Sequence, residues 1–411
     1  MTQYGLIGGK LGHSFSKVIH NQIADYQYDL IELTSEELKD FMIKKDFKAV
    51  NVTLPYKQEL IPYLDEMRQA AKDIGAVNCI RNEGGRLIGH NTDFDGLMAL
   101  IKYLGLELKN KWVLILGTGG TSDTANAVCQ TLGASRVIKV SRSGKNGSIT
   151  YGEAIENCKG VEIIINTTPC GMYPDNYSAA IDLTHFPNLE GVVDVVYNPL
   201  RTSLVYQALE LGLKAQGGLY MLVAQAVKAS EFFLKTEYDD KLIEKIYMNL
   251  LKEKTNIVLT GMPASGKTTI GRILANKLNR KLIDTDDLIE NKAGMKISEI
   301  FERYGETYFR NLETEAVKEA SKECGVIIST GGGVVLRQEN VRALKQNGLV
   351  FFNNRDVNKL IPTDNRPTAL SKEAILKRFE ERYQTYKSTA DYVISNNKSA
   401  EDVANKILEV F

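Results

Sequence analysis

Residues 256–272, NIVLTGMPASGKTTIGR, decide the fold of the last third of the chain. An apolar β-branched run leads into a glycine-rich loop, and the apolar residues then recur at helical spacing. Strand, loop and helix in this order are the context of a phosphate-binding P-loop. Backbone N–H groups of the loop favour anionic phosphates, Lys267 reaches the terminal ones, and the Thr268 hydroxyl can ligate Mg²⁺. The predicted ATP-binding residues here are Gly261, Ala264, Ser265, Gly266, Lys267, Thr268 and Thr269.

Length and composition limit the number of domains and the kinds of partner that this protein can have. The 411 residues suggest two or three domains. Lys+Arg and Asp+Glu balance at 51 each, so global charge does not support a nucleic-acid or membrane partner. The five scattered cysteines indicate thiols in a reducing compartment. With neither a signal peptide nor an apolar run of about 20 residues, we expect a soluble cytoplasmic protein.

Polar residues cluster at predicted strand ends in the first hundred residues. Residues 8–21, GGKLGHSFSKVIHN, carry two serines, and the strand over 48–53 runs into Pro55 and Lys57. The segment GHNTD at 89–93 adds amides, a hydroxyl and a carboxylate. Turn chemistry explains any one of these residues. Together they indicate a site for a small polyhydroxylated molecule.

The pattern in the middle of the chain predicts a Rossmann unit. A strand over 111–116 is followed by GTGGTS at 117–122 and a predicted helix over 123–132. The next strand, 136–140, ends in a basic, hydroxyl-rich turn where an NAD site would place a carboxylate. A guanidinium suits a 2′-phosphate, so we predict NADP(H), the alternative being a solvated basic turn. The predicted cofactor residues are Gly117, Gly119, Gly120, Ser141, Arg142, Ser143, Lys145, Thr167 and Gly217.

Residues 1–252 resemble shikimate dehydrogenase. The motifs HSFS, NVTLPYK, GAVN, NTDFDG, GTGGTS, INTTPCGM, DVVYNPLRT and GGLYMLVAQA occur in that order. The resemblance implies Lys57 and Asp93 as the catalytic pair. The residues it implies for binding shikimate or 3-dehydroshikimate are Ser14, Ser16, Asn51, Thr53, Lys57, Asn78, Asp93, Tyr197 and Gln225.

The last third carries further polar motifs. A strand over 281–284 leads into two carboxylates two apart, which suit a hydrated Mg²⁺ and an acceptor hydroxyl. A helix around 306–316 places Arg310 and Glu313 on one face. Three glycines follow the strand over 326–329, and Arg366 lies in a polar segment typical of a lid.

With the P-loop, these motifs resemble shikimate kinase over about residues 254–411. The resemblance implies Lys267, Asp286 and Arg366 as catalytic residues, with Arg366 also contacting ATP. Thr268 and Asp284 would hold Mg²⁺, partly through water. The lid is short and lacks an expected adenine-stacking arginine, for which Lys359 is the nearest candidate. The residues implied for binding shikimate are Asp286, Arg310, Gly332, Gly333 and Arg382.

The combined interpretation is an α/β chain with three parts. Residues 1–104, completed by helices at 217–252, form the substrate lobe of a two-lobed dehydrogenase, and 105–216 form its Rossmann NADP lobe. Residues 254–411 form a P-loop kinase domain resembling the nucleoside-monophosphate kinases, with a lid at about 357–372. A charged helix over 239–254 connects the modules.

We therefore expect a bifunctional shikimate-pathway enzyme. It reduces 3-dehydroshikimate to shikimate with NADPH, then phosphorylates shikimate with ATP and Mg²⁺. One alternative is a quinate-type polyol dehydrogenase fused to another small-metabolite kinase. A second makes one module a degenerate sensor or scaffold. The sequence leaves a homodimer open.

Overall fold

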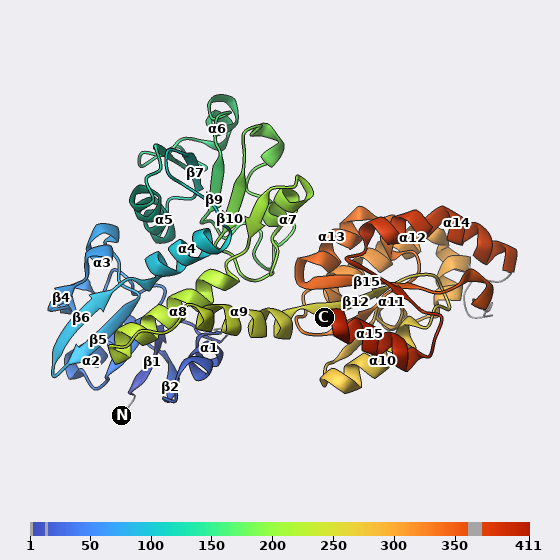
Figure 1. Ribbon diagram of the computed structural model, residues 1–411, viewed down its shortest axis with the longest axis horizontal. Coiled ribbons are helices and arrows are strands. Elements are labelled where there is room, and N and C mark those ends of the chain that lie inside the picture. The colour runs from blue at the N-terminus through green and yellow to red at the C-terminus, as the bar shows by residue number, and fades with distance from the viewer. Residues whose placement is uncertain (1–2, 13–14, 361–371) are drawn as a thin grey trace. The chain divides into compact units, whose positions relative to one another are not determined.

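The computed structural model describes residues 3–12, 15–360 and 372–411. Two compact units divide the chain, Met1–Asn249 and Leu250–Phe411, hereafter unit 1 and unit 2 (Figure 1). The helix expected over 239–254 is present as α9 (Lys241–Lys254), which crosses the division. The predicted α/β fold class is confirmed, because the strands form three separate sheets among helices.

The first sheet of unit 1 is mixed, with strand order β2-β1-β3-β5-β6-β4. Helix α8 packs on α4 so closely that a Cβ on Gly96 would lie 2.8 Å from the Met221 carbonyl oxygen. Only glycine fits there, and the close packing fixes α4 beside the sheet. The elements are β1 (Tyr4–Gly8), α1 (Ser16–Ile23), β2 (Tyr28–Glu32), α2 (Ser35–Lys44), β3 (Ala49–Val52), η1 (Ile61–Tyr63), β4 (Glu66–Met67), α3 (Gln69–Ile74), β5 (Cys79–Glu83), β6 (Arg86–His90), α4 (Thr92–Tyr103) and α8 (Leu219–Leu234).

The second sheet of unit 1 is parallel, with strand order β11-β10-β9-β7-β8. Its central strands are continuous apolar runs because both faces are covered. The helix predicted over 123–132 begins earlier, at Gly120, because Gly119 serves as its N-cap. The elements are β7 (Trp112–Leu116), α5 (Gly120–Thr131), β8 (Arg136–Val140), α6 (Tyr151–Asn157), β9 (Ile163–Asn166), η2 (Leu183–His185), β10 (Gly191–Asp194), α7 (Ser203–Glu210) and β11 (Lys214–Gln216).

A buried carboxylate ties together the loops after β9 and β10. Asp194 accepts hydrogen bonds from Asn166 Nδ2 at 3.0 Å, from the Val196 N–H at 3.0 Å and from the Thr202 hydroxyl at 2.7 Å. Burial raises the pKa of Asp194 to about 6, against the lowering effect of these donors. The network therefore fixes the backbone at Thr167, just after β9, and at Tyr197, just after β10.

Unit 2 contains one parallel sheet, with strand order β13-β14-β12-β15-β16. The P-loop strand β12 is central. The helix expected around 306–316 is longer and interrupted, because Gly305 has a φ of 78°. The elements are β12 (Asn256–Thr260), α10 (Lys267–Leu278), β13 (Leu282–Asp284), α11 (Thr285–Ala293), α12 (Ile297–Ala320), β14 (Ile327–Ser329), η3 (Val334–Leu336), α13 (Gln338–Asn347), β15 (Gly348–Asn354), η4 (Val357–Lys359), α14 (Lys372–Thr389), β16 (Tyr392–Ser395) and α15 (Ala400–Val410).

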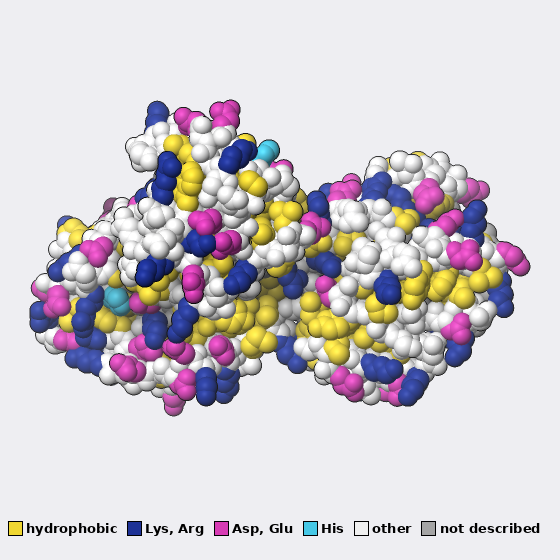
Figure 2. Space-filling model, turned by 45° about the horizontal axis from the view of Figure 1, so that its top comes forward, with side chains coloured by type: hydrophobic (Ala, Val, Ile, Leu, Met, Phe, Trp, Pro, Cys, Tyr) yellow, Lys and Arg dark blue, Asp and Glu magenta, His cyan; other side chains and the backbone are white. Residues whose placement is uncertain are grey.

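The surface mixes charges of both signs. Figure 2 shows basic and acidic side chains interspersed over the drawn face of each unit. Among the described residues, no helix combines the length and apolar character needed to span a bilayer.

Candidate active sites

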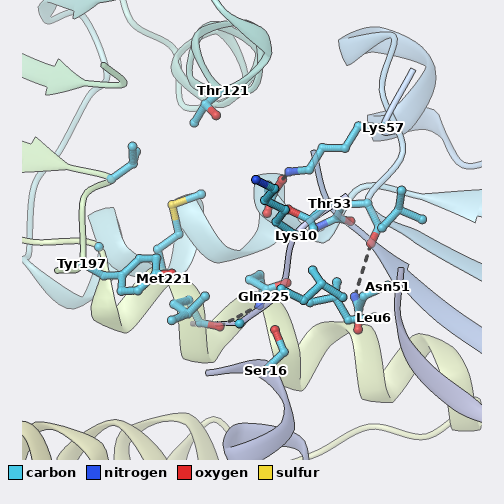
Figure 3. A pocket seen from close by; sticks show the side chains of 18 residues that line it. Leu6, Lys10, Ser16, Asn51, Thr53, Lys57, Thr121, Tyr197, Met221 and Gln225 are labelled. Carbon is cyan, nitrogen blue, oxygen red and sulfur yellow. Dashed lines mark hydrogen bonds and ion pairs between the residues drawn. The ribbon is translucent and has the colours of Figure 1, made fainter. Parts of the chain in front are cut away.

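Unit 1 contains a polar cavity of about 430 Å³. Figure 3 shows Asn51, Thr53 and Lys57 on one side of it and Tyr197 and Met221 on the other. Predicted substrate residues from distant parts of the sequence therefore meet at one site. Ser14 lies outside the described residues, and the remaining predicted residues all line the cavity: Ser16, Asn51, Thr53, Lys57, Asn78, Asp93, Tyr197 and Gln225.

A lysine and an aspartate are paired in this cavity. Lys57 Nζ lies 2.6 Å from Asp93 Oδ2, and both side chains keep some exposure, 26% and 20%. Asp93 lies in the first turn of α4, where the N-cap residue Asn91 accepts from the Asp93 N–H at 3.1 Å. Because an ammonium has three donors, Lys57 can bind Asp93 and still donate to a ligand.

A buried hydrogen-bond network, which no motif indicated, orients the cavity amides. The Tyr28 hydroxyl donates to Asn51 Oδ1 at 2.7 Å, and Asn51 Nδ2 donates to the Asn78 carbonyl oxygen at 3.3 Å. The Asn78 side chain accepts in turn from the Thr92 N–H at 2.7 Å. The His20 ring stacks on Tyr28 with centroids 3.9 Å apart, and burial lowers its pKa to about 3, which keeps it neutral.

Two further residues line the cavity, one from α5 and one at the start of α8. Thr121 and Gly218 line it, although the sequence did not single them out for the substrate site. A Cβ on Gly218 would lie only 2.1 Å from the carbonyl oxygen of Val195, the first residue after β10. Only glycine therefore lets the start of α8 pack this closely against that segment. Gln225 lies on α8 and donates to the Leu222 carbonyl oxygen at 2.8 Å while lining the cavity.

The predicted dinucleotide residues lie at the C-terminal edge of the parallel sheet. Gly117 has a φ of 112°, and a Cβ there would lie 2.7 Å from Thr167 Oγ1. Gly119 and Gly120 begin α5, so their N–H groups lie at a helix N-terminus. Gly217 lies beside the loop after β10, with an added Cβ 2.6 Å from the Leu200 carbonyl oxygen. No atom lies within 4 Å of a Cβ built on Gly119 or Gly120, so the helix N-terminus is open at this edge.

The basic turn after β8 contains one serine that is hydrogen-bonded within the turn and three residues with exposed side chains. The Ser141 hydroxyl lies 2.7 Å from the Ser148 hydroxyl and accepts from the Gly144 N–H at 3.1 Å, so it stabilises the turn. Arg142, Ser143 and Lys145 are exposed. The charged groups that can meet a 2′-phosphate are therefore Arg142 and Lys145.

The P-loop of unit 2 has the expected geometry. Gly266 is the N-cap of α10, and Lys267 begins the helix. Lys267 is buried, with Nζ donating to the carbonyl oxygens of Gly261 at 3.0 Å and Met262 at 2.9 Å. Thr268 Oγ1 donates to Asp284 Oδ2 at 2.8 Å. A hydroxyl beside a carboxylate fits Mg²⁺, which is held by few protein ligands and keeps several waters.

A second cavity, of about 200 Å³, lies on the β13 and β14 side of the P-loop. Asp286, which the structure places in the first turn of α11, lines it with Arg310, Arg382, Gly332 and Gly333. A Cβ on Gly333 would lie 2.0 Å from Arg310 Nη1, so glycine makes room for this guanidinium. Arg382 Nη1 donates to the Gly332 carbonyl oxygen at 3.2 Å.

Arg310 and Glu313, which the sequence predicts on one helix face, form an ion pair. Arg310 Nη1 lies 2.8 Å from Glu313 Oε2, and burial raises the pKa of Glu313. Glu313 Oε1 is buried without a hydrogen-bond partner among the described residues. Arg366 and the rest of 361–371 lie outside the described residues, whereas 357–359 form η4 and Lys372 begins α14.

Comparison with known families agrees with this division of sites. A family model described as the shikimate dehydrogenase substrate-binding domain matches residues 6–80. A second family model, for shikimate kinase, matches residues 263–411.

Individual relatives cover unit 1. A Clostridium perfringens protein named shikimate dehydrogenase (NADP⁺) is 34% identical over 278 residues, 61% of this chain and 98% of that protein. A solved structure of shikimate dehydrogenase 1 from Peptoclostridium difficile is 33% identical with a TM-score of 0.55, covering 61% of this chain and 98% of the other. A Thermus thermophilus shikimate 5-dehydrogenase, solved with NADP(H) and shikimate, is 27% identical with a TM-score of 0.54, covering 61% and 99%.

Proposed function

The chain belongs to the shikimate dehydrogenase family and carries a C-terminal shikimate kinase domain, and we propose which of its residues serve each reaction of a bifunctional shikimate-pathway enzyme. Residues 1–104 with 217–252 bind the dehydrogenase substrate, 105–216 bind NADP(H), and 254–411 bind ATP and shikimate. The observation that carries the proposal is the Lys57–Asp93 pair, 2.6 Å apart, in a cavity lined by hydroxyls and amides.

In unit 1, Lys57 acts on the carbonyl oxygen of 3-dehydroshikimate. Bound NADPH supplies the hydride. As negative charge develops on the carbonyl oxygen, the Lys57 ammonium stabilises it and donates the proton. Asp93 holds the ammonium and accepts from a substrate hydroxyl. Asn51, fixed by Tyr28, and Asn78, fixed by Thr92, bind the other hydroxyls.

In unit 2, Asp286 accepts the proton of the shikimate 3-hydroxyl as it attacks the γ-phosphate of ATP. Arg310 and Arg382 bind the shikimate carboxylate, because guanidinium groups match carboxylate geometry. Lys267 neutralises charge on the transferring phosphoryl group, a role that Arg366 shares. Thr268 and Asp284 hold Mg²⁺, which offsets phosphate charge when bound.

We place both activities in the cytoplasm. All five cysteines are free thiols, which suits a reducing compartment. The balanced charge gives no support to a nucleic-acid or membrane partner. A homodimer stays a prediction.

Arg142 tests the proposed cofactor site. Replacing Arg142 by alanine is expected to raise the KM for NADPH about 10- to 100-fold, because a hydrogen-bonded charge on the 2′-phosphate is lost. The KM for NADH, which lacks that phosphate, stays the same. Initial rates with both cofactors measure the difference.

A matched control comes from the other end of β8. Arg136 begins that strand, with its guanidinium 4.3 Å from the centre of the Trp112 ring. Arg136→Ala should leave the KM for NADPH unchanged. If Arg142→Ala raised the KM for NADH and for NADPH equally, or raised neither, the assignment of Arg142 would be contradicted.

A further inference from the structure

A third charged side chain lines the cavity of unit 1. Lys10 lies two residues after the end of β1, and it lines the cavity together with Lys57 and Asp93. Figure 3 shows Lys10 among the labelled side chains of the cavity. None of the sequence motifs gives this lysine a role. Its ammonium is therefore a charge in the candidate active site that the reaction proposed above does not use.

The backbone on both sides of Lys10 is held in place. The Gly9 N–H donates to the Leu54 carbonyl oxygen at 3.2 Å. The Leu11 N–H donates to Glu32 Oε1 at 2.7 Å, and the Leu11 side chain is buried. Lys10 itself is exposed, and a lysine carries three donors at the end of a flexible stem. The ammonium can therefore adjust to a bound molecule while the loop that carries it stays in place.

The charges that line the cavity do not cancel. Two lysines and one aspartate line it, and every other lining residue that the structure describes is uncharged. Asp93 Oδ2 lies 2.6 Å from Lys57 Nζ, so this pair is neutral as a whole. Within the described ranges 3–12, 15–360 and 372–411, Lys10 forms no ion pair. The described lining therefore carries one excess positive charge, which favours a ligand with one negative charge.

The substrate proposed above has one negative charge, which lies on its carboxylate. Its carbonyl oxygen is assigned to Lys57, and its hydroxyls are assigned to amides and to Asp93. The phosphates of NADP(H) are assigned to residues 105–216, at the N-terminus of α5 and in the turn with Arg142 and Lys145. The carboxylate is the ionised group left without a cation. Among the described residues that line the cavity, Lys10 is the cation left without an anion.

We propose that Lys10 is a substrate-binding residue of unit 1, whose ammonium pairs with the carboxylate of 3-dehydroshikimate and of shikimate. The Ser16 hydroxyl lines the same cavity, but a neutral hydroxyl can donate to a carboxylate and to an uncharged ester alike. A charged donor binds the anion more strongly, so Lys10 selects the ionised acid. The proposal rests on the dehydrogenase function proposed above, because that function supplies the carboxylate.

Lys10→Ala tests the proposal in the full-length enzyme, assayed for oxidation by NADP⁺ in the absence of ATP. The KM for shikimate is expected to rise about tenfold, which is the scale of a lost hydrogen bond to a charged group. The KM for methyl shikimate, whose ester carries no charge, should change less than about twofold. An unchanged KM for shikimate, or an equal rise for both molecules, would overturn the assignment.

Control variants separate this outcome from other failures. Lys17, an exposed lysine on α1 outside the lining of the cavity, is the matched control, and Lys17→Ala should keep the wild-type KM for shikimate. Lys10→Arg keeps the charge and should restore most of the affinity. An equal rise in Lys17→Ala, or a rise in the KM for NADP⁺ alone in Lys10→Ala, would also overturn the proposal. An unchanged kcat shows that unit 1 is folded, and Lys10→Gln replaces the alanine variant if it is not. A wild-type enzyme that oxidised neither molecule would refute the dehydrogenase function itself.

Discussion

Replacing Lys57 by alanine is expected to lower kcat for the reduction of 3-dehydroshikimate about 10³-fold, within the range of general acid catalysis. The physical reason is that the variant loses both the proton donor and the positive charge beside the developing oxyanion. Asp93 would then lie in the cavity without its partner at 2.6 Å. The KM for the substrate should change much less, because Asn51, Asn78 and Tyr197 still bind it.

The same chain provides the control for this variant. Phosphorylation of added shikimate by Lys57→Ala should match the wild-type rate, which shows that the protein is intact. Lys102→Ala removes another lysine paired with an aspartate, at 3.7 Å from Asp240, on an 83% exposed side chain. Exposed pairs contribute little, so this variant should reduce 3-dehydroshikimate normally. A loss of less than about tenfold in Lys57→Ala would contradict the catalytic role.

Replacing Lys267 by alanine removes kinase turnover in the same way. We expect kcat for shikimate phosphorylation to fall about 10³-fold, because a fixed charge on the transferring phosphoryl group is lost in a buried site. Nζ donates to two loop carbonyl oxygens, which keeps the lysine inside the P-loop. Steady-state assays with saturating ATP and shikimate measure the loss.

A lysine on the same helix is the control for Lys267. Lys277 lies near the C-terminal end of α10 and pairs with Glu401 at 2.6 Å on the surface. Lys277→Ala should keep wild-type kinase activity. Dehydrogenase activity should be unchanged in both variants. If Lys267→Ala retained more than about a tenth of the wild-type kcat, the proposed role of the P-loop lysine would be wrong.

Local sequence was enough to predict several parts of the sites. The P-loop was predictable because strand, glycine loop and helix are contiguous in 256–272. Arg310 and Glu313 were predicted on one helix face because they are three residues apart, and there they form an ion pair. The substrate residues of unit 1 came from ordered motifs, and all of those that the structure describes line one cavity.

The remaining features depend on tertiary contacts that no local pattern encodes. Tyr28 in β2 reaches Asn51 in β3 past the intervening strand β1, and nothing near Tyr28 in the sequence indicates that partner. Asn353 and Asn396 contact the Ser265 carbonyl oxygen of the P-loop from positions 88 and 131 residues later in the chain. The start of α5 was placed three residues too late, because a glycine N-cap leaves no side-chain capping signal.

The central claim is that one chain carries two successive reactions of the shikimate pathway. The most direct measurement is a one-pot assay with 3-dehydroshikimate, NADPH, ATP and Mg²⁺, read by mass spectrometry. We predict that shikimate 3-phosphate forms, and that shikimate accumulates when ATP is omitted. Absence of any reduction of 3-dehydroshikimate, or shikimate that never becomes a phosphate ester with ATP present, would contradict the account.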